Sequence, residues 1–493
     1  MSKRNSSKPA AAFACFLAVI MTVAGVPAQT PMSQKTANSI MSRNPAPYTD
    51  GGRTWSYVIG TVLKAFQELY LRTDNAAYLT YIRNTVDAEV NSNGTMNKYK
   101  VTEYNLDQVR EGASVLFLYL KTGEAGYKTA IDLIRTQLNV GQQPRTSEGG
   151  FWHKQVYRFQ MWQDGLYMAE PFYAEYSKTF NNADTADLND IVKQFILMEK
   201  HARDSATGLI YHGWDERKEQ SWADKVTGCS KSFWGRAMGW YAMALVDVLD
   251  YLPSTYAKRD DLIAILQRLT SALVNYQDSV SGCWYQVVDQ GDRTGNYLES
   301  SATSMYVYTL FKAVRLGYID QSFQTAALKG YQGILTTFVT ENGGSITVSK
   351  TCQSAGLSDD RNGTFEYYIN ESVVSNDGKA LGPFILASLE YENRTTARPA
   401  VPEVHTINRG RSNVFIDACT GRVTVRFSLA QQSAVSLGLF SIDGKELLRR
   451  DCGSLQQGVH LQAIDMSHFS AGVYLLKSLI GDLSVCSVIH FSG

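Results

Sequence analysis

Apolar residues recur with helical spacing in six separate segments of the chain, whose starts lie roughly 50 to 75 residues apart. Each segment is long enough for four or five helical turns. The segments cover residues 54–71, 106–123, 161–178, 235–252, 301–318 and 377–393. The pattern therefore predicts six principal helices.

Most of these segments are followed by a loop and a second, more polar helical segment, for example residues 260–277. The first helix of each pair is apolar almost all round, which suits an inner position, whereas the second is amphipathic and suits an outer one. Six such hairpins that close on themselves form an all-α (α/α)6 barrel. We predict this fold for about residues 35–395, because the spacing is too irregular for a solenoid.

The pattern changes after the last of these helices. Residues 396–410 are polar and contain proline, as a linker does, whereas residues 411–493 alternate apolar and polar positions. Asp443 and Gly444 stand between two strand-like runs and predict a hairpin turn. We therefore expect a small C-terminal all-β sandwich.

The N-terminus has the layout of an export signal. Lys3, Arg4 and Lys8 precede an apolar run over residues 10–26, and small residues follow at a cleavage point near residue 28. This predicts a signal peptide over residues 1–28 and a secreted, periplasmic or cell-surface bacterial protein, with an uncleaved or lipidated anchor as the alternative. No other segment reaches transmembrane length, so no membrane span is expected after cleavage.

Composition excludes several partners and cofactors. A formal net charge of +0 with 19% charged residues provides no basic field for nucleic acid. The cysteines are too scattered for a zinc pattern, and no HExxH motif occurs, so we expect no metal and no cofactor. Export would permit a disulfide or two, and buried free thiols are the alternative.

Candidate chemistry gathers where loops meet the predicted inner helices. His153 and His212 each stand beside tryptophan in such loops, and Asp107 and Asp164 come near the starts of two helices. Either aspartate could cap its helix through the free backbone amides. An inner helix that starts at the mouth of a barrel also places its first residues in the cleft, so capping and catalysis both remain open.

Arg236 stands between Trp234 and Trp240. A guanidinium beside an indole can hold a sugar carboxylate through two parallel hydrogen bonds while it stacks on the ring. The alternative is a structural ion pair, for which Asp215 and Asp224 are the candidate partners.

Five motifs together resemble glycoside hydrolase family 105, the unsaturated rhamnogalacturonyl hydrolases: EGGFWHK, MWQDGLYM, YHGWDE, FWGRAMGWYAMAL and YLESSATSMYVYTL. The resemblance implies an (α/α)6 barrel and a short oligosaccharide substrate with a 4,5-unsaturated galacturonic acid at its non-reducing end. Such ends are left by pectin lyases. An unsaturated glucuronyl hydrolase acting on glycosaminoglycan fragments and a non-catalytic sugar-binding surface protein are the alternatives.

Carried over by motif, the resemblance implies Asp164 as the general acid and base. The implied substrate-binding positions are Asp107, His153, Lys154, Trp162, His212, Trp234 and Arg236. The sequence GRAMGW departs from the expected GRGNGW, which puts the floor of the pocket in doubt.

The C-terminal region resembles the sorting domains that the type IX secretion system of Bacteroidetes-like bacteria reads. The resemblance rests on LFSIDGKELLRR and on the alternating segment that follows it, and it implies contact with secretion machinery. The usual lysine-rich end is missing, so a carbohydrate-binding or merely structural sandwich is the alternative.

Overall fold

The computed structural model describes residues 30–395, 415–419, 422–429, 431–466, 468–470, 472–481 and 483–491. The predicted signal peptide and the predicted linker over residues 396–410 lie outside these described residues.

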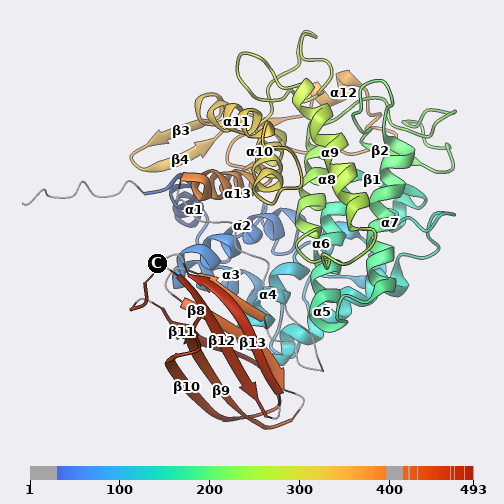
Figure 1. Ribbon diagram of the computed structural model, residues 1–493. Helices are drawn as coiled ribbons and strands as arrows, with labels where there is room; N and C mark the ends of the chain where they lie inside the picture. Colours follow the sequence, from blue (N-terminus) through green and yellow to red (C-terminus); the bar gives the residue numbers. More distant parts are fainter. Residues whose placement is uncertain are drawn as a thin grey trace, which may run out of the picture.

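Six helices form a closed inner ring (Figure 1). They are α2 (Tyr57–Thr73), α4 (Gly112–Thr122), α6 (Gln163–Phe180), α8 (Gly235–Val248), α10 (Ser300–Arg315) and α13 (Gly378–Thr395). Each packs against the next, and α13 packs against α2, which closes the ring. These are the six predicted principal helices, and the prediction of a helical barrel is confirmed.

A second helix packs outside each inner one. After the first five inner helices come α3 (Ala76–Asp87), α5 (Ala125–Thr136), α7 (Thr185–Ala202), α9 (Arg259–Asn275) and α11 (Phe323–Thr337). The outer partner of α13 is instead α1 (Met32–Arg43), from the start of the barrel. Ser33 on α1 donates to Glu392 on α13 through its backbone nitrogen at 3.0 Å and its hydroxyl at 2.7 Å.

Burial explains which helices lie inside. All residues of α8 are buried, as an apolar surface all round the helix requires. The outer helix α5 buries a single stripe that includes Tyr127, Ile131 and Ile134. The sequence contrast between the two helices of a hairpin thus corresponds directly to their layers.

Short elements connect the hairpins. They are β1 (Gln160–Trp162), β2 (Gly213–Asp215), β3 (Val339–Asn342), β4 (Ser345–Val348), β5 (Thr351–Cys352), β6 (Val373–Val374), α12 (Phe365–Ile369), and the single turns η1 (Val101–Glu103), η2 (Leu106–Gln108), η3 (Gln137–Gly141) and η4 (Gln155–Tyr157). The strands pair as three antiparallel ribbons, β1 with β2, β3 with β4, and β5 with β6.

The C-terminal region consists of strands in two antiparallel sheets (Figure 1). The strands are β7 (Phe415–Cys419), β8 (Arg422–Leu429), β9 (Ser433–Ser441), β10 (Glu446–Leu455), β11 (Gly458–Asp465), β12 (Gly472–Ile480) and β13 (Leu483–Phe491). One sheet has the order β10-β9-β12-β13 and the other β11-β8-β7, and buried residues of both share one apolar cluster. The predicted turn at Asp443 and Gly444 joins β9 to β10, with Gly444 at φ +86°.

Three properties of the described residues bear on function. None of their helices is both long and apolar enough to cross a membrane. They contain no group of three or more histidine, cysteine or acidic side chains placed to hold a metal ion. Five cysteines are free thiols: Cys229, Cys283, Cys352, Cys452 and Cys486.

Candidate functional site

Several inner helices bring their first residues to the same end of the barrel. Tyr57 is the first residue of α2, and Asp164 and Arg236 lie in the first turns of α6 and α8. The pKa of Tyr57 is raised, chiefly by burial. Arg236 partly opposes this shift, whereas the negative charges of Asp107, Asp164 and Asp377 add to it. These groups therefore act on one another across a single barrel mouth.

The ribbon of β1 and β2 positions the start of α6. Trp162 pairs with Gly213 in this ribbon, and the backbone nitrogen of Gln163 donates to the carbonyl of His212 at 3.1 Å. The Gln163 side chain also donates to the carbonyls of Ile210 and Tyr211, each at 2.9 Å. This clamp holds the His212 loop against Asp164.

The first of two aspartate and histidine pairs is Asp107 with His153. The Nε2 of His153 lies 3.0 Å from Oδ1 of Asp107, and the Nζ of Lys154 lies 2.7 Å from Oδ2. The backbone of Leu106 donates to the carbonyl of His153 at 3.0 Å, which ties the two loops together. Burial alone would raise the pKa of Asp107, but Lys154 and His153 outweigh it and lower that pKa, so the carboxylate stays ionised.

The second pair is Asp164 with His212. The Nε2 of His212 lies 3.1 Å from Oδ2 of Asp164, but the two groups are not aligned as a hydrogen bond. The other ring nitrogen of His212, Nδ1, lies 2.7 Å from the hydroxyl of Tyr368. His212 is fully buried, whereas 14% of the Asp164 side chain is exposed, so the carboxylate can be reached from the cleft.

Trp162 joins the two pairs. Its ring stacks on His153 with centroids 4.9 Å apart and on Tyr157 at 4.8 Å, and it meets the edge of His212 at 5.5 Å. On the far side of His212, Trp234 lies 4.7 Å away and stacks on Tyr368 at 5.7 Å. Aromatic rings are therefore packed side by side around the two pairs at the mouth.

Arg236 lies over Trp234, with its guanidinium carbon 4.7 Å from the ring centroid. Its Nη1 donates to the carbonyl of Cys352 and lies 4.0 Å from the buried carboxylate of Glu299. The prediction of Asp215 or Asp224 as the ion-pair partner is therefore wrong. Both of those carboxylates accept backbone amides within their own loops instead.

The helix-cap interpretation of the two aspartates is also wrong. Helix α6 begins at Gln163, its N-cap is Trp162, and Asp164 lies inside the first turn. Asp107 lies in η2, ahead of α4, whose N-cap is Glu111. Neither carboxylate caps its helix, and both remain available at the barrel mouth.

Four residues of the site were not singled out in the sequence: Tyr57, Gln163, Glu299 and Tyr368. Glu299 caps α10 through the backbone nitrogen of Ala302 at 2.7 Å and also accepts from the backbone of Cys352 at 3.0 Å. Its position at the start of a predicted inner helix was a usable signal. Tyr368 gave none, because 156 residues separate it from His212.

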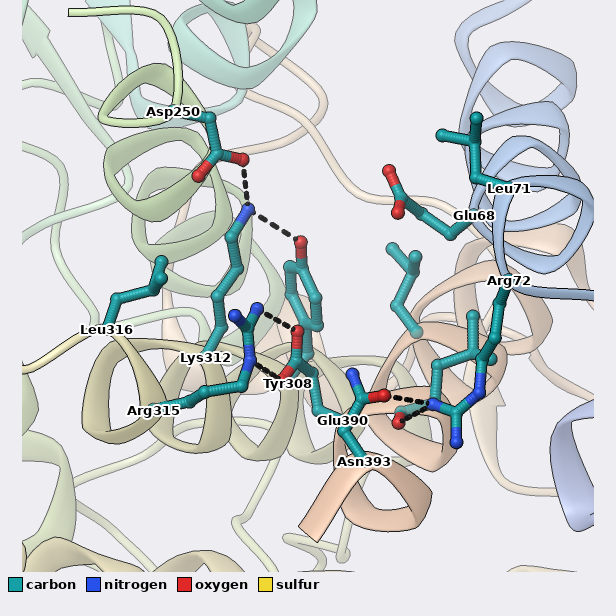
Figure 2. Close-up of a pocket in the computed structure, with 12 residues that line it drawn as sticks. Glu68, Leu71, Arg72, Asp250, Tyr308, Lys312, Arg315, Leu316, Glu390 and Asn393 are labelled. Atoms are coloured by element: carbon teal, nitrogen blue, oxygen red, sulfur yellow. Dashed lines mark hydrogen bonds and ion pairs between the residues drawn. The ribbon is translucent and has the colours of Figure 1, made fainter. Parts of the chain in front are cut away.

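A pocket of about 220 Å³ lies near the other ends of the helices (Figure 2). Figure 2 shows its charged side chains turned toward one another: Lys312 with Asp250 at 2.6 Å, and Arg315 with both oxygens of Glu390 at 2.7 Å. Arg72 donates to the carbonyl of Leu389 at 2.7 Å. These contacts tie α2, α10, α13 and the turn after α8 together, so this pocket holds a structural network.

A helical barrel with aromatic rings and carboxylates at its mouth has the groups that a glycosidase needs. The chain belongs to glycosyl hydrolase family 88, whose model matches residues 32–395. This is a family of unsaturated uronyl hydrolases, which act on unsaturated uronic-acid oligosaccharides.

Individual relatives are consistent with this family assignment. The structure of a family 105 glycoside hydrolase from C. acetobutylicum ATCC 824 is 43% identical, with a TM-score of 0.70, and covers 74% of this chain and 100% of that one. Protein Atu3128 of Agrobacterium fabrum is 36% identical over 232 residues, which are 45% of this chain and 97% of the relative. The unsaturated rhamnogalacturonyl hydrolase YesR of Bacillus subtilis is 28% identical over 276 residues, 54% of this chain and 74% of the relative.

Proposed function

We propose that the protein removes 4,5-unsaturated galacturonic acid from the non-reducing end of rhamnogalacturonan lyase products, with Asp164 as the general acid and base. The observation that carries this proposal is the position of Asp164, in the first turn of an inner helix, partly exposed beside Trp162 and 3.1 Å from His212. The name of the relative YesR, an unsaturated rhamnogalacturonyl hydrolase, supports the choice of substrate.

The chemistry needs one carboxyl group that both gives and takes a proton. The double bond of the substrate is an enol ether conjugated to a carboxylate, so protonation at C4 leaves an oxocarbenium-like centre at C5. Water adds at C5 while the deprotonated carboxylate accepts its proton. The resulting hemiketal opens and releases the aglycone, and acid and base catalysis of this kind contributes about a hundredfold to ten-thousandfold.

The remaining residues would bind and orient the sugar. Arg236 would hold the substrate carboxylate, because its guanidinium is fixed over Trp234 and stays charged. Trp162 and Trp234 would form apolar walls against the ring. The pair of Asp107 and Lys154 would hydrogen-bond sugar hydroxyls while keeping a fixed charge pattern at the mouth.

Lyase digests of rhamnogalacturonan, homogalacturonan and chondroitin test the proposal. The conjugated double bond absorbs in the ultraviolet, so hydration appears as a loss of absorbance, and the Asp164→Asn variant is the matched control. We expect the fastest loss with the rhamnogalacturonan digest. Faster loss with chondroitin would identify a glucuronyl hydrolase, and binding without any loss would identify a non-catalytic sugar-binding protein.

We further propose that residues 1–28 direct export and that the C-terminal region is a β-sandwich that serves as a sorting domain. The support is the sequence layout of the N-terminus and, for the sandwich, one apolar cluster shared by two sheets. Fractionation of expressing cells tests both, since deletion of residues 411–493 should leave the enzyme inside the cell envelope if the region is a sorting signal. Unchanged release of the truncated protein would exclude the sorting role.

A further inference from the structure

A buried carboxyl lies directly behind the barrel mouth. Glu170 is on α6, is 1% exposed, and its Oε2 has no hydrogen-bond partner among the described residues. His153 is 3% exposed, and its Nδ1 is likewise without a partner in the described part of the chain. Buried polar atoms in folded proteins almost always find a partner, so two such atoms near one another call for an explanation.

Both residues line the same small cavity. Its volume is about 10 Å³, which is room for one water molecule and not for several. The other lining side chains are apolar, apart from Gln194. Gln194 is already engaged, because its Oε1 accepts from Phe151 at 2.7 Å and its Nε2 donates to the carbonyl of Gly149 at 3.2 Å.

Gly165 keeps this space open. A Cβ built at Gly165 would lie 3.0 Å from Nδ1 of His153, so a side chain there would press on that nitrogen. Gly165 also lines the cavity, together with Leu166, which is one helical turn from Glu170 on the same face of α6. The Nδ1 edge of His153 therefore faces the part of α6 that carries Glu170.

We propose that Glu170 is a positioning residue that, through one water bound in this cavity, holds His153 in the tautomer that donates from Nε2 to Asp107. In this series of hydrogen bonds, the Glu170 hydroxyl donates to the water and the water donates to Nδ1 of His153. The Nε2 hydrogen of His153 then donates to Oδ1 of Asp107, 3.0 Å away. Each link has one donor and one acceptor. The stacking of His153 on Trp162, at 13° between the ring planes, fixes the direction of both nitrogens.

The protonation state of Glu170 supports this direction. Burial raises the pKa of Glu170 well above its ordinary value, and Asp190 raises it further. Arg145 and Arg135 oppose this effect, but Arg145 is ion-paired with Asp190 and Arg135 with Asp187. The raised pKa favours the neutral acid form of Glu170, and only that form can donate a hydrogen bond to the water.

The proposal rests on the proposed function only for its effect on catalysis, because the water and the tautomer can be observed without substrate.

Two variants of Glu170 test the proposal, and both replacement side chains match glutamate in length. Glu170→Gln keeps a donor at the end of the side chain, whereas Glu170→Met removes it. A high-resolution crystal structure of the wild type should show a water within hydrogen-bond distance of Oε2 and Nδ1, and its absence would overturn the proposal.

Nitrogen NMR of histidine-labelled protein reads the tautomer directly, with the His153 signal assigned by its loss in His153→Gln. We expect Nδ1 to be unprotonated in the wild type and in Glu170→Gln, and this pattern to be lost in Glu170→Met. Turnover over KM should fall at least about fivefold in Glu170→Met, which is the effect of losing one buried hydrogen bond. It should stay near the wild-type value in Glu170→Gln. An unchanged tautomer in Glu170→Met would overturn the proposal, and if that variant fails to fold, a protonated Nδ1 in Glu170→Gln would do so.

Discussion

The two aspartate and histidine pairs at the barrel mouth look alike but differ in their charge balance. Asp107 has Lys154 at 2.7 Å and His153 at 3.0 Å. Asp164, among the described residues, has only His212 within ion-pairing distance, and that contact is not aligned as a hydrogen bond. A carboxylate fixed as an anion cannot deliver a proton, so the difference favours Asp164 as the acid and Asp107 as a fixed charge.

The strongest way to break this comparison is Asp164→Asn. The amide keeps the size of the side chain but cannot give and take the proton, so we expect turnover to fall at least about a hundredfold. Substrate binding and thermal unfolding should stay near wild type, as ligand titration and calorimetry would show. Turnover near the wild-type rate would assign the acid to another group.

Asp107→Asn should weaken substrate handling and also lower stability, and its effect on stability should depend on pH. Because the folded state lowers the pKa of Asp107, the pair contributes stability above the ordinary aspartate pKa and loses it as pH falls through the folded value. We expect a deficit of roughly 2 to 3 kcal/mol at neutral pH. Denaturant unfolding across pH should show this deficit shrinking below about pH 4. A deficit that is the same at every pH would remove the ion pair as its cause.

Arg236→Lys tests which side of the mouth holds the substrate carboxylate. A lysine cannot reproduce the planar, two-pronged contact of the guanidinium. We therefore expect a loss of about 1 to 3 kcal/mol of transition-state stabilisation, measured as a lower turnover over KM. The acid and its neutral methyl ester are compared in wild type and variant, and the variant should lose much of the preference for the acid. If the preference is unchanged in Arg236→Lys but lost in Lys154→Met, the Asp107 side of the mouth binds the carboxylate.

Gly165→Ala should disturb the Asp107 and His153 pair with the smallest effect of the four. The new Cβ would lie 3.0 Å from both Nδ1 of His153 and Cδ1 of Leu106, an overpacking that costs about 1 kcal/mol. Gly356→Ala is the matched control, because its Cβ would meet the flexible end of Arg361 at 3.2 Å. Equal melting temperatures and equal activities in the two variants would contradict the close approach at Gly165.

The inner ring could be predicted because its signal is local. A helix that is buried all round must be apolar all round, and α8 shows this in its own sequence. The closure by α1 could not be predicted in the same way, because MSQKTANSIMSR is polar overall, and its buried face includes Ser33, Thr36 and Ser39. Its place against α13 depends on contacts such as that between Ser33 and Glu392, which are remote in sequence.

The sequence named candidate residues of the site one by one, but it did not predict their pairings. Motifs place Asp164 and Arg236 near helix starts and His212 in a loop between two hairpins, and a helix start at a barrel mouth faces the cleft. The partners of these residues come from elsewhere in the chain, as Tyr368 does for His212 and Glu299 for Arg236. The cap interpretation failed by two residues at the start of α6, because the N-cap is Trp162 and not Asp164, and such a shift is the usual uncertainty of a helix boundary.

The central claim is that the reaction proceeds by hydration of a double bond with one acid, and matched oligosaccharides test it most directly. Two substrates are prepared with the same aglycone, one ending in 4,5-unsaturated galacturonic acid and the other in saturated galacturonic acid, and release of the aglycone is followed by chromatography. The account predicts release from the unsaturated substrate only, because the saturated ring offers no site for protonation at C4. Comparable release from both would show substitution at the anomeric carbon, with one carboxyl group as acid and a second as nucleophile or base, and it would contradict the account.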